Sequence, residues 1–129
     1  MPELLYPTEH RRIPLHDAVS AMLSDVGCKP TLLGFNYLAR AIELVLEDSS
    51  RLSGIVKKVY ATVAEEFSST SSRVERNCRT AILSLWLTQP TAVLEKYFSC
   101  RTQRKKSNPT VKEFVAALCD KFMLDYYGL

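Results

Sequence analysis

Apolar residues recur at helical spacing through most of this chain, and this pattern restricts the fold more than any other feature. In segment after segment, several apolar side chains fall on one stripe at about 100° per residue. The alternation of apolar and polar residues that indicates a half-buried strand does not compete with it. We therefore predict an all-α domain. The expected helices cover residues 17–27, 35–48, 52–60, 62–67, 71–86, 90–98 and 110–126.

Several helix ends carry recognisable signals. Gly27 follows an apolar stripe, at a position where a helix C-terminus favours positive φ. Asn108 and Pro109 are expected as N-cap and first residue of the last helix. Ser72 and Glu75 have the spacing of a capping box at the start of the helix 71–86.

The helix 71–86 is apolar on one side and basic on the other. A stripe faces one way, formed by Val74, Cys78, Ala81 and Leu85 with Ile82 at its edge. Arg76 and Arg79 point the opposite way, flanked by Arg73 and Thr80. A short helix precedes it, with Val63, Ala64 and Phe67 expected inward, and only residues 68–70 separate the two. Two helices joined by so tight a turn predict a helix-turn-helix, whose second helix lies in the major groove of DNA.

The polar residues of this helix have two interpretations each. Arg73 and Arg76 are expected either to make bidentate contacts to guanine or to contact phosphates without reading sequence. Glu75 is expected either to cap the helix or to accept a hydrogen bond from a cytosine amino group. Ser71, Ser72, Arg79 and Thr80 are expected to flank the reading site. An ordinary surface helix with solvated arginines is the competing interpretation.

A second basic cluster lies in a segment without apolar periodicity, and it contains Arg101, Arg104, Lys105 and Lys106. We expect a loop that either clamps DNA phosphates or is simply solvated.

Residues 19–124 resemble the DNA-binding effector domain of stage zero sporulation protein A, a response regulator that controls entry into sporulation. The most specific matching segments are residues 34–42, 55–60, 71–76, 79–82, Trp86 and 108–114. The resemblance implies about six helices around a helix-turn-helix, tandem dimers on short operator boxes, and transcription regulation. It assigns base reading to the Arg-Val-Glu-Arg motif, here Arg73, Glu75 and Arg76, and contact with RNA polymerase sigma subunits to residues 88–96.

The chain departs from the family at two positions and in one expected domain. Thr80 stands where the family usually has histidine, and Ala61 replaces a proline that precedes the first helix of the motif. The family places a receiver domain before this region, whereas only about fifteen residues precede it here. We therefore expect a free-standing effector domain (16–129), or a fragment, behind a flexible amino-terminal arm or linker (1–15).

Composition agrees with this hypothesis without establishing it. The chain has 129 residues, 47% of them hydrophobic, and a net charge of +3, which suits one domain and permits DNA binding if basic residues share a face. The four cysteines lack zinc-site spacing, and we expect reduced thiols, no metal, no cofactor and no membrane span. A cytoplasmic location follows from these expectations.

Two other functions compete with DNA binding. A helical adaptor or inhibitor acting on a sporulation regulator or sigma factor would keep the scaffold but would not need the reading arginines. An enzyme is not expected, because catalysis needs a nucleophile and base held together, and both histidines lie near the amino terminus.

Overall fold

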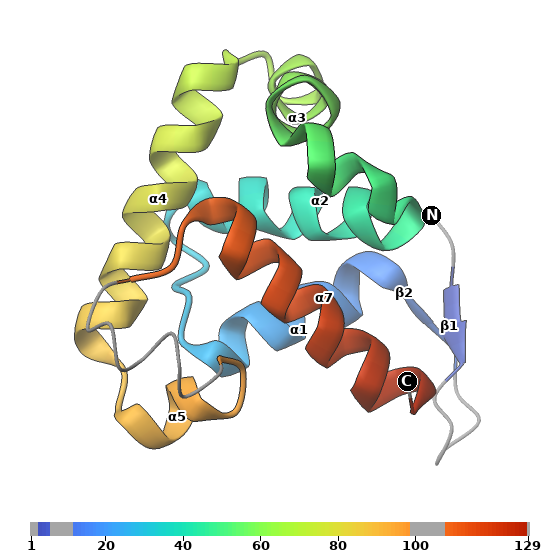
Figure 1. Ribbon diagram of the computed structural model, residues 1–129, viewed down its shortest axis with the longest axis vertical. Coiled ribbons are helices and arrows are strands. Elements are labelled where there is room, and N and C mark those ends of the chain that lie inside the picture. Colours follow the sequence, from blue (N-terminus) through green and yellow to red (C-terminus); the bar gives the residue numbers. More distant parts are fainter. Residues whose placement is uncertain (1–2, 6–11, 99–107, 129) are drawn as a thin grey trace.

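Helices surround one central helix in the computed structural model of the chain (Figure 1), which describes residues 3–5, 12–98 and 108–128. The all-α prediction is confirmed apart from two strands of three residues each. In chain order the elements are β1 (Glu3–Leu5), β2 (Arg12–Pro14), α1 (Leu15–Val26), α2 (Leu33–Glu47), a 3-10 helix η1 (Ser49–Gly54), a π-helix η2 (Val56–Tyr60), α3 (Ala61–Glu66), α4 (Ser71–Thr88), α5 (Thr91–Glu95) and α7 (Val111–Tyr127).

The central helix is α2, which packs against α1, α4 and α7. Ten of its 15 residues are buried, so its apolar surface extends around most of the helix rather than along the single stripe that the sequence predicts. A helix that is apolar on nearly all sides belongs in the interior. An aromatic cluster joins α4 to α7. The ring of Phe98 contacts both Trp86 of α4 and Phe114 of α7, with centroid distances of 5.4 and 5.6 Å.

The two strands pair as an antiparallel ladder in which Leu4 lies opposite Ile13. They fall within the segment 1–15, for which the sequence predicts a flexible arm or linker. Three residues are too few to show a period of two, so the sequence pattern does not reveal this ladder.

The helices expected at 52–60 and 62–67 are in fact continuous in the structure, because η1, η2 and α3 follow one another without a break. Ala61 donates its backbone N–H to the Val56 carbonyl, a bond that a proline at this position cannot make. The π-helix also changes the residue spacing, and the apolar residue Val56 is 58% exposed.

Helix ends agree with the sequence at one site and differ at another. Gly27 ends α1 with φ of 103°, as predicted. Asn108 and Pro109 do not start the last helix. Instead Thr110 is its N-cap, in a capping box in which the Thr110 hydroxyl accepts from Glu113 N (3.1 Å) and the Glu113 carboxylate accepts from Thr110 N (2.9 Å). Two reciprocal bonds at Thr110 satisfy more helix-end donors than one amide cap at Asn108.

Candidate nucleic-acid interface

The start of α4 is set by a turn of four residues after α3. Ser68 has a positive φ of 54°, which ends α3, and Ser69 N donates to the Ala64 carbonyl at 2.8 Å. Thr70 then adopts an extended conformation, and its hydroxyl accepts a hydrogen bond from Arg73 N at 3.2 Å. Thr70 is therefore the N-cap of α4.

The predicted capping box of Ser72 and Glu75 is consequently wrong. Ser72 lies within the first turn of α4, two residues after the real N-cap, so its backbone is helical rather than extended. Glu75 therefore does not cap the helix, which was one of the two roles expected for it. Its carboxylate lies 3.5 Å from the Arg79 guanidinium, one turn further along the helix.

The buried side of α4 is the side that the sequence predicts. Its buried residues are Val74, Cys78, Ala81, Ile82 and Leu85. Burial raises the pKa of the Cys78 thiol far above its ordinary value, so this cysteine packs as an apolar group and stays protonated. Asn77 Nδ2 donates to the Arg73 carbonyl at 2.8 Å, within the first half of the helix.

A close approach between α2 and α4 holds the helix in place. A Cβ atom added to Gly34 would lie only 2.2 Å from the backbone oxygen of Asn77 and 2.9 Å from Ala81 Cβ. Only glycine permits the two backbones to come so near. The first half of α4 is thus fixed against the central helix.

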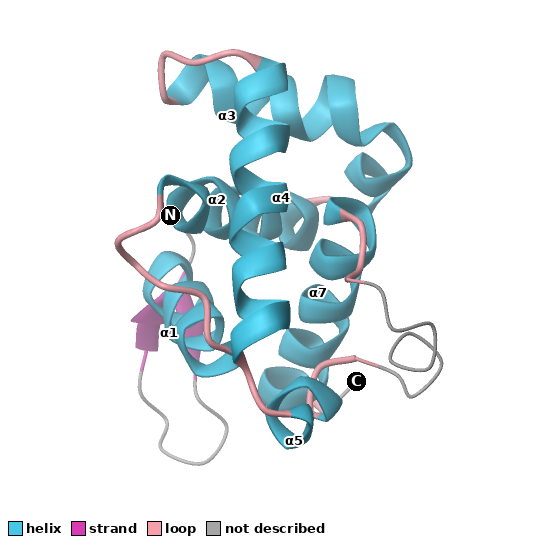
Figure 2. Cartoon of the chain, turned by 90° about the vertical axis from the view of Figure 1, so that its left-hand side faces the viewer, coloured by secondary structure: helices cyan, strands magenta, loops and turns pink. Residues whose placement is uncertain are grey.

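The opposite side of α4 faces solvent, and Figure 2 shows this helix uncovered at the front of the molecule. Arg73, Arg76, Arg79 and Thr80 are exposed there, while Ser71 and Glu75 are partly buried. Among the described residues, Arg73 and Arg76 have no ion-pair partner. The structure therefore brings the predicted reading residues together on one accessible face.

A depression of about 300 Å³ lies beside this face, between α4 and the π-helix η2. Its lining residues are Val56, Tyr60, Ser71, Ser72, Glu75, Arg76 and Arg79. Burial is the main cause that raises the pKa of Tyr60 to about 12, with Cys78 and Glu75 contributing. Lys57 and Lys58 of η2 are exposed on the same element. Sequence reasoning did not include η2 in the site, because nothing in the linear pattern places it beside α4.

The second predicted basic cluster, Arg101, Arg104, Lys105 and Lys106, lies outside the described residues. Its predicted phosphate contacts stay a prediction.

In the part of the chain that the structure describes, no three histidine, cysteine or acidic side chains gather in a way that suits a metal ion. Cys28, Cys78 and Cys119 are buried and free of disulfide bonds. None of the helices in the same ranges combines the length and apolar character needed to cross a membrane.

These features define a small helical domain in which a basic, solvent-facing helix follows a tight turn and packs on a central helix. A family model described as "Sporulation initiation factor Spo0A C terminal" matches residues 19–122. Because this match covers most of the chain, the chain belongs to the Spo0A C-terminal family of sporulation initiation factors. The resemblance inferred from the sequence is thereby confirmed.

Proposed function

We propose that this chain is a sequence-specific, double-stranded DNA-binding transcription regulator of the sporulation-initiation type. The observation that carries the proposal is the exposed arginine face of α4, a helix whose other side is packed against α2. A rigid helix with accessible guanidinium groups fits the width of the major groove and presents donors to base edges.

Within this proposal α3 and α4 act as a helix-turn-helix, and α4 enters the major groove. Arg73 and Arg76 donate bidentate hydrogen bonds to guanine, and Glu75 accepts from a cytosine amino group. The Glu75–Arg79 ion pair of 3.5 Å orients both side chains before binding. An aligned pair costs less side-chain entropy at the interface than two free side chains.

The remaining polar residues contact the DNA backbone. Ser71, Ser72 and Thr80 flank the readers on α4. Lys57 and Lys58 are exposed on η2, the helix that contributes Val56 and Tyr60 to the depression. The basic cluster at 101–106 acts as a phosphate clamp. Such contacts add affinity that falls with salt and fix the orientation of the readers.

The proposal extends to partners and location by way of the family. The chain binds tandem operator boxes as a dimer, contacts a sigma subunit of RNA polymerase through residues 88–96, acts in the cytoplasm and catalyses no reaction. In the structure this region comprises the end of α4 and the short helix α5. Glu95, the last residue of α5, and Lys96, which follows it, are exposed.

The test measures fluorescence anisotropy with two duplexes. One is the sequence that the wild-type chain enriches from a randomised library, and the other is its scrambled version. Arg73→Ala and Arg76→Ala should each weaken binding to the selected duplex by roughly 5- to 150-fold, since a good arginine–guanine pair contributes about 1–3 kcal/mol. Binding to the scrambled duplex at low salt should persist.

Lys121→Ala is the matched control, because it also removes one positive charge but lies on α7, paired with Asp125 at 3.1 Å. It should leave both affinities nearly unchanged. If the arginine variants weaken binding no more than this control, α4 is not the reading helix. If the wild-type chain binds no duplex even at low salt, the adaptor function replaces this proposal.

A further inference from the structure

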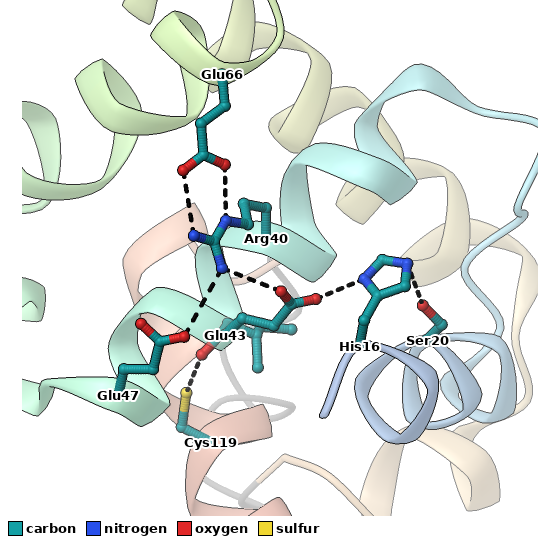
Figure 3. Close-up of polar contacts among 8 residues, drawn as sticks. His16, Ser20, Arg40, Glu43, Glu47, Glu66 and Cys119 are labelled. Carbon is teal, nitrogen blue, oxygen red and sulfur yellow. Dashed lines mark hydrogen bonds and ion pairs between the residues drawn. The ribbon is translucent and has the colours of Figure 1, made fainter. Parts of the chain in front are cut away.

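Arg40 of α2 joins three carboxylates from two helices in the cluster drawn in Figure 3. Its Nε and Nη2 atoms donate to the two carboxylate oxygens of Glu66, at 2.7 and 3.1 Å. Its Nη1 atom donates to Glu43 at 3.1 Å and lies 3.8 Å from Glu47. Glu66 is the last residue of α3, so the guanidinium fastens the end of α3 to the central helix.

The orientation of Arg40 is itself fixed from the other side. Glu43 is fully buried, and both of its oxygens are engaged, one by Arg40 and the other by His16 Nδ1 of α1 at 2.6 Å. The other ring nitrogen of His16 lies 3.5 Å from the Ser20 hydroxyl. Because the guanidinium is planar and is contacted on both edges, its orientation is fixed, and Nε and Nη2 point toward Glu66.

A second contact holds Phe67, the residue that follows Glu66. The ring of Phe67 meets the ring of Tyr37 edge to face, with a centroid distance of 5.3 Å. Tyr37 lies three residues before Arg40 on α2, so the two share one face of the helix. Phe67, which is expected inward from the sequence, is in fact 42% exposed, and its ring packs against Tyr37. Two neighbouring side chains of α2 therefore hold two consecutive residues, Glu66 and Phe67.

Glu66 ends α3, and Phe67 is the first residue of the four-residue turn that leads into α4. Ser68 takes its left-handed conformation immediately after Phe67, and Thr70 then caps α4. Arg73, Glu75 and Arg76 follow within the first two turns. If residues 66 and 67 moved, the reading residues would therefore move with them, because only a few residues lie between.

We propose that Arg40 and Tyr37 form a clamp on Glu66 and Phe67 that positions the reading turns of α4, so that residues remote from the reading face contribute to sequence specificity. The inference rests on the proposed DNA-binding function. The proposed clamp depends on the bidentate geometry of Arg40. A lysine at position 40 would keep the charge beside Glu43 but could not form two parallel hydrogen bonds to Glu66.

The experiment compares Arg40→Lys, Glu66→Gln and their double variant with the wild-type chain. Glu66→Gln keeps the size of a side chain that is 38% exposed, so this variant is expected to fold. Glu47→Gln is the matched control, because it removes another carboxylate near Arg40 without loosening α3. Binding is measured to the duplex that the wild-type chain enriches and to its scrambled version, with folding checked by circular dichroism.

We expect Arg40→Lys and Glu66→Gln each to lower the ratio of selected to scrambled affinity by roughly 2- to 30-fold. Affinity for the scrambled duplex at low salt should stay within about twofold, and the double variant should be no worse than the worse single variant. Glu47→Gln should match the wild type. An unchanged ratio, or an equal fall in both affinities, would overturn the inference.

Hydrogen exchange provides a readout that does not depend on DNA. Backbone amides in the first two turns of α4 should exchange faster in Arg40→Lys and Glu66→Gln than in Glu47→Gln. If the wild-type chain enriches no sequence, the proposed function fails, and this measurement still decides whether the clamp positions α4. Exchange equal to that of the control would mean that it does not.

Discussion

Replacing Gly34 with alanine tests whether the close crossing of α2 and α4 is required. The new Cβ would lie 2.2 Å from the Asn77 carbonyl oxygen, although such contacts almost never fall below 3.0 Å, so the two backbones must separate by about 0.8 Å or more. Overpacking typically costs about 1–3 kcal/mol, and the upper part of this range, about 2–3 kcal/mol, applies here because a backbone oxygen cannot rotate away. Alanine returns at most about 0.5–1 kcal/mol through its better helix propensity. The expected net loss is about 1–2 kcal/mol of unfolding free energy.

Urea denaturation followed by circular dichroism measures this loss directly. The midpoint should fall while the m-value stays constant, because the surface exposed on unfolding hardly changes. For a domain of 129 residues the Tm should drop by about 3–10 °C.

Gly54→Ala is the control for that experiment, since its added Cβ would meet only the flexible side chain of Lys58, at 3.1 Å. This variant should remain within about 0.5 kcal/mol of the wild type. If Gly34→Ala is as stable as Gly54→Ala, the crossing has room for a methyl group. The physical reasoning for a tightly fixed α4 would then be refuted.

Three further predictions concern stability. Thr70→Ala should lower the unfolding free energy by about 1 kcal/mol through loss of the cap, whereas Ser72→Ala should change it by less than about 0.5 kcal/mol, and equal effects in urea titrations would contradict the assignment. Glu43→Ala should cost about 3 kcal/mol, near the low end for breaking a buried ion pair because Arg40 retains Glu66, and a midpoint like that of the wild type would count against it. Burial raises the pKa of Cys28 to about 11, so between pH 9 and 11 the unfolded chain loses a proton that the folded chain keeps. Stability should therefore fall as pH rises through this window, and less steeply in Cys28→Ala; an identical slope in that variant would rule out the contribution.

Local periodicity accounts for what could be predicted correctly. The buried stripe of α4, from Val74 to Leu85, follows from the spacing of apolar residues alone, because a helix turns by the same angle wherever it lies. The same holds for the exposure of Arg73 and Arg76 on the opposite side. The end of α1 at Gly27 was also predictable, since only a residue tolerant of positive φ suits that position.

Helix starts were predicted less well, because a cap depends on the path of the preceding chain. Ser72 and Glu75 satisfy the spacing of a capping box, yet the turn at Ser68 brings Thr70 to the N-cap position first. The start of α7 shows the same effect, because Thr110 and not Asn108 is its N-cap. Several residues at each helix start have suitable side chains, and the local sequence does not choose among them.

The sequence by itself determined the class of fold and the two-sided character of α4, because both follow from interactions within one helix. Only the tertiary structure decided which partners the helices meet. Three contacts join residues that are 26 or more positions apart: His16 with the buried Glu43, Arg40 with Glu66, and Gly34 with Asn77. Such contacts depend on where separate helices cross, and no periodic pattern within a single helix encodes that position.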